Sequence, residues 1–276
     1  MRFAFIFPLL ACFISLGGCN HKQGVSQREA TVIIFRSADG RTLTKEDLRG
    51  VTGMFRWEII GKTGVSAEAE SLHKQGRRAG AAGAYNKALN LLTRASNLAP
   101  GWPYPIYDMA YTFLLMNDAD NARKYYRKTL ELAPRGFFTA ITALDALERE
   151  KKGDLQAGTY LAYLSREWLD DPGKKAELVR LLVTKVPRFA PAWEDLANTL
   201  DRDVDRLAAI ERGLAAEPDP ETKGMLLINK ALVLDRAGDH NGAVKLLGEL
   251  ALDPESTYGT EHLAKASLAL MAERTR

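Results

Sequence analysis

The sequence predicts an all-α fold, a superhelix (solenoid) of helical hairpins, preceded by a small N-terminal α/β module. Two observations predict the superhelix. Pro100 and Pro134 lie 34 residues apart, and a fixed period of this length is typical of a repeat array. Small residues let the two helices of a hairpin approach closely, and each proline ends a second helix. The same shift of 34 residues pairs side chains of similar size: Gly76 with Ala110, Ala88 with Ala122, Leu92 with Tyr126, and Ala95 with Thr129.

The order of bulky and small residues within each unit is that of a known family. The second unit contains Ile106, Ala110, Phe113, Ala122, Tyr126, Thr129 and Pro134. This pattern resembles the tetratricopeptide repeat (TPR) family. The first unit resembles it as well, except that Ala79 is small where the family has a bulky residue. The resemblance covers residues 67–276 and implies the helical-repeat fold. It implies no single function, because one fold hosts many.

The units that follow are less regular. Residues 137–150 and 155–169 are expected to form a divergent third pair, with Leu144 where the pattern has a small residue. Residues 174–186 predict a single helix. Trp193 then restarts the pattern, and a last regular pair ends at Pro254. Residues 259–274 predict a final helix in the place of the solvated cap that such arrays need.

Residues 1–18 have the features of a signal peptide. Arg2 precedes an apolar stretch of about 14 residues, whereas a membrane-spanning helix needs about 20. The stretch ends in Leu16-Gly17-Gly18-Cys19, which resembles the bacterial lipobox and implies cleavage before Cys19 and lipidation of its thiol. The alternative is an ordinary secretory signal with an incidental cysteine. Asn20 favours the outer membrane in the enteric-type sorting rule, so we expect a lipid-anchored protein of the bacterial cell envelope, on the periplasmic face of the outer membrane.

Residues 19–30 are polar and predict a flexible tether. Residues 31–66 predict a small strand-containing module, with strands at residues 31–36 and 54–60, a turn at Asp39-Gly40, a short strand at residues 41–43 and a helical turn at residues 44–51. So small a unit is not stable alone, and we expect it to pack on the first hairpin.

Composition and motifs exclude several classes of function. The net charge is only +3, and Lys and Arg are spread along the chain, so a nucleic-acid partner is not indicated. Two cysteines allow neither a disulfide framework nor a cysteine-based metal site. We find no catalytic residues, metal ligands or cofactor motif, and therefore predict a protein that is not an enzyme. The alternative is an enzyme, or an enzyme subunit, with a small-molecule site in the groove or the N-terminal module.

The resemblance implies a concave groove lined by the first helix of each unit. Tyr104, Tyr107 and Tyr111 are spaced as one face of a helix, and tyrosines suit a peptide-binding surface. The alternative is that they pack against neighbouring helices or the N-terminal module. The other predicted groove residues are Leu115, His73, Arg77, Phe138 and Asp145.

These features predict an adapter or scaffold that binds a protein or peptide partner in the groove and is held at the membrane by Cys19. Self-association is a further alternative. The family's carboxylate-binding clamp is not expected, because its positions hold His73, Arg77 and Asp108, and Asp108 would repel a carboxylate. The basic residues of the fourth predicted helix, Arg123, Lys124, Arg127 and Lys128, are expected to form a solvated face or to contact anionic lipid.

Overall fold

The computed structural model describes residues 32–37, 41–44, 55–60 and 65–274. The predicted signal peptide, Cys19, the tether and nearly all of the predicted helical turn at residues 44–51 lie outside the described residues. None of the helices in the described part of the chain is long and apolar enough to cross a membrane.

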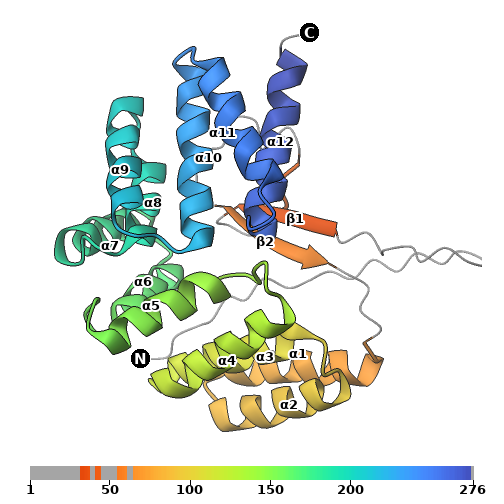
Figure 1. Cartoon of the computed structure of the whole chain (residues 1–276). Helices are drawn as coiled ribbons and strands as arrows, with labels where there is room; N and C mark the ends of the chain where they lie inside the picture. The colour runs from red at the N-terminus through yellow and green to blue at the C-terminus, as the bar shows by residue number, and fades with distance from the viewer. Residues whose placement is uncertain (1–31, 38–40, 45–54, 61–64, 275–276) are drawn as a thin grey trace, which may run out of the picture.

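The first half of the array consists of two regular hairpins and one short one (Figure 1). Its helices are α1 (Ala67–Ala81), α2 (Tyr85–Leu98), α3 (Pro103–Leu115), α4 (Ala119–Leu132), α5 (Ala140–Lys152) and α6 (Thr159–Leu164), the last continued by the 3₁₀ helix η1 (Ser165–Trp168). The first two hairpins confirm the predicted pairs.

The second half contains a single helix, two hairpins and a last helix. They are α7 (Pro172–Lys185), α8 (Ala190–Thr199), α9 (Asp203–Ala215), α10 (Pro220–Arg236), α11 (His240–Leu252) and α12 (Tyr258–Arg274). The predicted restart at Trp193, the last pair and the final helix are all confirmed.

Aspartate side chains begin several of these helices. Asp118, Asp171, Asp219 and Asp239 each accept hydrogen bonds from backbone amides of the first turn, which would otherwise lack acceptors. The turn inside the second hairpin needs a left-handed residue, and Asn117 supplies it with φ of 59°.

The 34-residue period corresponds to real contacts. Ala88, Ala110 and Ala122 are completely buried. A Cβ on Gly76 would lie 2.8 Å from Leu92 Cγ, so only glycine lets α1 and α2 approach this closely. The matched small residues therefore set the distance within each hairpin, and the described residues form a TPR-like helical repeat.

One predicted helix is wrong in extent. We expected residues 155–169 to form the second helix of the third pair, but α6 begins only at Thr159 and passes into η1 at Ser165. The cause is local. Gly158 has φ of 84°, and Glu150 of α5 accepts hydrogen bonds from the amides of Gly158 (2.8 Å) and Tyr160 (2.7 Å), which fixes the later start.

The predicted strands are confirmed as an antiparallel pair. β1 (Val32–Ser37) pairs with β2 (Phe55–Ile60), with Val32 opposite Ile60. Leu43, between them in sequence, packs against the apolar cluster of α10, α11 and α12. Leu43 thus contacts the last helices, and packing of the rest of the segment on the first hairpin stays a prediction. Whether residues 31–66 form a separate module stays a prediction.

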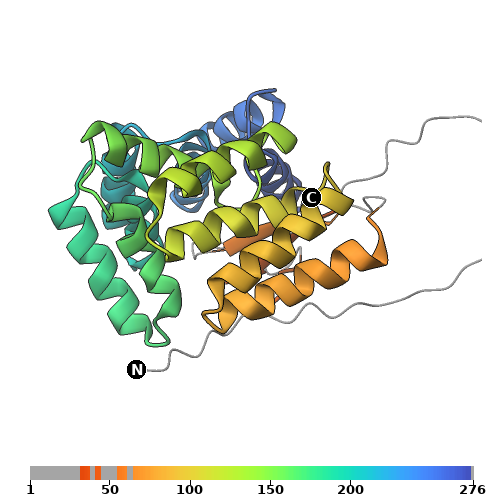
Figure 2. The same cartoon turned by 90° about the horizontal axis from the view of Figure 1, so that it is seen from below.

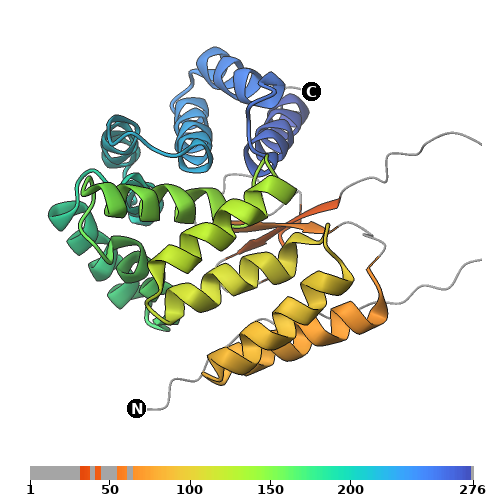
Figure 3. The same ribbon diagram turned by 60° about the horizontal axis from the view of Figure 1, so that its bottom comes forward.

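The helices follow an arc rather than a straight stack. Figure 3 shows them running from α1 through α5–α9 to α12, with β1 and β2 between the two ends of the arc, and Figure 2 shows the same arrangement from below. The last helix is also contacted from the first half of the array: Arg135, which precedes α5, binds the first turn of α12.

Candidate functional site

The first helices of successive hairpins meet side by side. His73 of α1 bonds to Asp108 of α3, and Asn198 of α8 bonds to Asn229 of α10. Tyr107 of α3 bonds to Thr139, the residue before α5. We call this side of the array the first-helix face. The predicted groove residues all come from it.

An aromatic cluster dominates the N-terminal half of this face. Tyr104 lies 4.8 Å from Phe137 and 5.5 Å from Phe138, ring centre to ring centre, in edge-to-face geometry. Tyr107 lies 5.2 Å from Phe138, and Trp102 lies 5.8 Å from Tyr104. We call these five residues the aromatic ridge. Phe137 is buried, while the other four keep part of their surface exposed. The ridge therefore combines partly exposed aromatic side chains from α3 and the segments before α3 and α5, which suits recognition of a peptide.

Phe138 has an unusual backbone conformation. Its φ of 48° lies in the left-handed region, where a bulky residue is strained by roughly 1–2 kcal/mol. The ring contacts made by Phe138 offset this cost. Strain of this kind is concentrated at functional sites, so it marks the ridge as a candidate site.

The tyrosines behave differently from one another. The hydroxyl of Tyr107 shares a hydrogen bond of 2.8 Å with Thr139, and burial raises the pKa of Tyr107 above its usual value. Tyr111 packs against the main apolar cluster. Tyr107 and Tyr111 therefore fit the alternative, in which the tyrosines pack against neighbouring elements. Tyr104 fits it less well.

His73, Arg77 and Asp108 meet at the edge of the ridge. His73 Nε2 lies 2.6 Å from Asp108 Oδ2, and Arg77 Nε lies 3.7 Å from the same oxygen. His73 also packs edge-on against Trp102 at 4.8 Å. These three residues occupy the positions of the family's carboxylate clamp, and the structure places them side by side. Because Asp108 already binds two basic side chains, it anchors them rather than standing free for a ligand.

Two predicted groove residues lie apart from the ridge. Asp145 pairs with Arg149 on its own helix at 3.6 Å, and burial followed by the charge of Asp219 raises the pKa of Asp145. Leu115 is half-buried at the last turn of α3. Neither side chain is part of the aromatic cluster.

Sequence reasoning missed a second polar group on the first-helix face. It contains Arg166 of η1, Glu194, Asp195 and Asn198 of α8, and Asn229 of α10. Arg166 Nε lies 2.6 Å from Asp195 Oδ2, and both side chains are almost fully buried. Burial and then the charge of Asp195 raise the pKa of Glu194 to about 8. The signal in the sequence was the spacing of Glu194, Asn198 and Asn229, which repeats that of His73, Arg77 and Asp108.

Two of the four basic residues of α4 are paired with acidic side chains. Arg123 is buried and pairs with Asp120, and Arg127 pairs with Glu148 on α5. Lys124 and Lys128 lie over the ring of Tyr125 at 5.9 and 5.4 Å. This face therefore carries a smaller positive charge than the sequence suggests.

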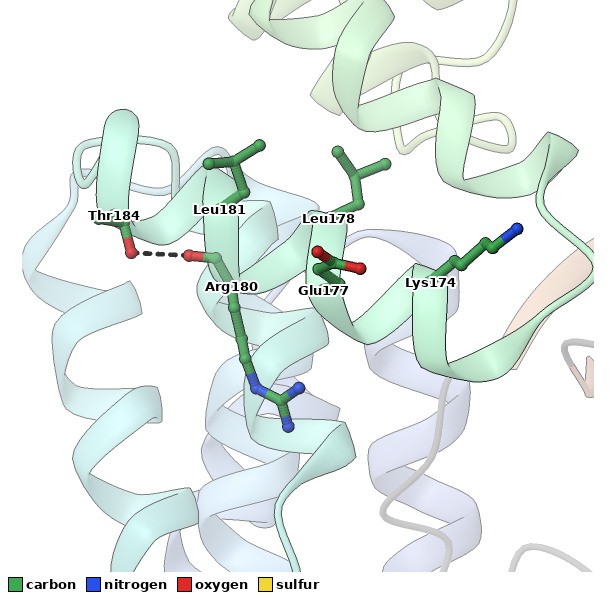
Figure 4. Close-up of a pocket in the computed structure, with 6 residues that line it drawn as sticks. All are labelled: Lys174, Glu177, Leu178, Arg180, Leu181 and Thr184. Carbon is green, nitrogen blue, oxygen red and sulfur yellow. Dashed lines mark hydrogen bonds between the residues drawn. The ribbon is translucent and has the colours of Figure 1, made fainter.

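A shallow pocket on α7 lacks the features of a ligand site. Figure 4 shows that its lining side chains, Lys174, Glu177, Leu178, Arg180, Leu181 and Thr184, all come from this one helix. The hydroxyl of Thr184 is already bonded to the carbonyl of Arg180. Ligand sites usually gather polar groups from several elements, so the first-helix face is the stronger candidate.

Within the described residues, no three His, Cys, Asp or Glu side chains are grouped so that they could hold a metal ion. The two other histidines among the described residues make local contacts. His240 Nδ1 lies 2.5 Å from Asp235, and His262 Nδ1 lies 3.0 Å from the carbonyl of Tyr258.

Comparisons with known proteins assign no function to the chain. No family model and no curated protein matches the chain. Among solved structures, it is similar to "MamA RS-1 ArsTM double mutant" at 17% identity, covering 74% of this chain and 98% of that chain, with a TM-score of 0.33. It is also similar to TTC0263, a TPR protein of Thermus thermophilus, at 19% identity, covering 72% and 99%, with a TM-score of 0.30. These similarities concern the fold alone, so the site is interpreted from its own geometry.

Proposed function

We propose that this chain is a non-enzymatic adapter that binds an extended peptide segment of a partner protein on its first-helix face. The observation that carries the proposal is the aromatic ridge. Four of its five members remain partly exposed, and they come from α3 and from the segments that precede α3 and α5. Rigid aromatic side chains give a large contact area with little loss of rotamer entropy, which is why they dominate binding surfaces.

We also propose that the adapter works in the bacterial cell envelope, anchored by lipid on Cys19 at the periplasmic face of the outer membrane. The Leu16-Gly17-Gly18-Cys19 sequence supports the anchor, and Asn20 supports the outer membrane. A short tether at residues 19–30 would hold the repeat array close to the bilayer.

The peptide site is tested by photo-crosslinking in cells from a benzoylphenylalanine placed at Tyr104, which keeps an aromatic ring in the ridge. The same group at Val244, which is exposed on α11, is the matched control. We expect a discrete crosslinked protein from position 104 that is absent from position 244 and weakened by Trp102→Ala. Identical products from both positions, or crosslinks within the chain alone, would exclude a partner site on the ridge.

The anchor is tested separately by Cys19→Ser. We expect the wild-type protein to fractionate with outer membranes and the variant to lose the acyl mass and the membrane association. A variant that stays in the membrane fraction with an unchanged mass would show that Cys19 carries no lipid.

A further inference from the structure

Two groups on the first-helix face share one sequence spacing. Arg77 follows His73 by four residues and precedes Asp108 by 31, and Asn198 follows Glu194 by four and precedes Asn229 by 31. In both groups the third residue reaches back across the helix boundary to bond with one of the first two. The array therefore builds the same three-residue arrangement twice, with different charges.

The first arrangement is satisfied internally, because Asp108 lies against both His73 and Arg77. The second is not. Asn198 Nδ2 donates to Glu194 Oε1 at 3.4 Å, and Asn229 Nδ2 donates to Asn198 Oδ1 at 3.2 Å. When Glu194 is ionised, as it is at and above about pH 8, its carboxylate can only accept, so this order of donors fixes both amide orientations.

The chain of donors ends at a buried acceptor. Asn229 is 5% exposed, and its Oδ1 has no hydrogen-bond partner among the residues that the structure describes. A buried amide oxygen without a donor is costly, so such atoms call for a reason. A ligand that donates an N–H to this oxygen would explain why the oxygen has no partner within the chain.

The charges around Glu194, Asn198 and Asn229 also favour a ligand that donates hydrogen bonds. Arg166 forms an ion pair with Asp195, with 2.6 Å between Nε and Oδ2. Glu194 makes no ion pair with any basic side chain in the described part of the chain. Glu194 and Asn198 are only half-buried, so part of each side chain stays accessible to a ligand.

We infer that Glu194, Asn198 and Asn229 form a binding site for an alkylammonium group. The three N–H donors of an ammonium match the Glu194 carboxylate, the amide oxygen of Asn198 and the amide oxygen of Asn229. The group can come from a lysine side chain of a bound peptide or from a free polyamine. The site goes beyond the aromatic ridge: it lies on different helices, and its binding does not depend on a partner at the ridge.

The test uses the purified protein at about pH 8, because the pKa of Glu194 is raised and the ammonium stays charged there. Side-chain amide signals of Asn198 and Asn229 are followed by NMR during titration with acetyl-lysine amide, with spermidine and with acetyl-glutamate amide. We expect both signals to move with at least one ammonium probe and to remain in place with the glutamate derivative.

Glu194→Gln keeps the shape and removes the charge, and we expect it to weaken binding of the ammonium probe about tenfold or more. Glu177→Gln makes the same change on the exposed face of α7 and should leave binding unaltered. Asn229→Leu, which removes the orphan oxygen, provides a second weakened variant if Glu194→Gln does not fold.

The outcomes distinguish the two sources of the ammonium group, and they distinguish this site from the aromatic ridge. Tighter binding of acetyl-lysine amide assigns the site to a peptide side chain, and tighter binding of spermidine assigns it to a free polyamine. Amide signals that move with neither probe at millimolar concentration, or that move equally in Glu194→Gln, overturn the site. The crosslinking result at Tyr104 is independent of all these outcomes.

Discussion

The guanidinium of Arg135 donates two hydrogen bonds, of 3.0 and 2.8 Å, to the carbonyl of Ser256, which lies 121 residues later in the chain. The same guanidinium pairs with Glu261 and lies 4.6 Å from the ring of Tyr258. The backbone carbonyl of Arg135 accepts from the amide of Tyr258 at 2.9 Å. This contact joins the segment between α4 and α5 to the first turn of α12, and so fixes the curvature of the array.

Arg135→Ala is expected to destabilise the protein by about 1–3 kcal/mol, because it removes charged hydrogen bonds from a half-buried site. Chemical denaturation measures this change, and hydrogen exchange should show faster exchange at the start of α12. Arg188→Ala is the matched control. It breaks an exposed pair with Glu217 and should change stability by less than about 0.5 kcal/mol. Equal effects of the two substitutions would contradict a structural role for the Arg135 contact.

Gly224→Ala is expected to destabilise the protein by roughly 1–3 kcal/mol or more. A Cβ at this position would lie 2.0 Å from Oγ1 of Thr260, which is buried, so α10 and α12 would have to separate. Gly248→Ala, inside α11, has open space around its Cβ and should be neutral or stabilising by up to about 1 kcal/mol. Thermal unfolding of both variants checks the pair, and a neutral Gly224→Ala would show that the helices are not in contact here.

The hairpins could be predicted from the sequence because their contacts repeat. A small residue is required wherever two helices touch, so Ala88 and Ala122 recur at one period and reveal the fold directly. The late start of α6 could not be predicted in this way. It depends on Glu150 of the preceding helix, which bonds to the amides of Gly158 and Tyr160.

The candidate site was predictable only where the register is regular. His73, Arg77 and Asp108 could be assigned to the clamp positions because they belong to the two best-matched units, and the structure brings them together. Glu194 was overlooked because an acidic residue on a helix is usually solvated. The contact of Arg135 with α12 has no local sequence pattern, since its partners lie more than 120 residues later in the chain.

Tyr126→Phe is expected to leave stability unchanged or to raise it by up to about 2 kcal/mol. Tyr126 is fully buried, and its hydroxyl has no hydrogen-bond partner in the described part of the chain, so removing the oxygen removes a desolvation cost. Tyr107→Phe is the comparison, because it breaks the bond to Thr139 and should cost about 0.5–1.5 kcal/mol. Urea unfolding measures both. A clear loss of stability in Tyr126→Phe would indicate a buried water bound to the hydroxyl.

Glu194→Gln is expected to change how stability depends on pH. Burial and the charge of Asp195 raise the pKa of Glu194 to about 8, whereas an unfolded glutamate titrates near 4.3. Between these values the folded chain holds a proton that the unfolded chain has released. The unfolded state then binds fewer protons, so the contribution of Glu194 is fully present below about pH 4.3 and is lost as pH rises towards 8.

Glutamine cannot ionise, so the variant should gain stability relative to the wild type by up to about 4 kcal/mol as pH rises from about 5 to about 8. Asp195 and Asp219, whose pKa values burial also raises, are present in both proteins and do not produce a difference by themselves. Urea unfolding followed by circular dichroism at several pH values measures the two curves. Parallel curves across this range would mean that Glu194 is ionised and well solvated in the native protein, and that its environment is not the buried, acidic one described above.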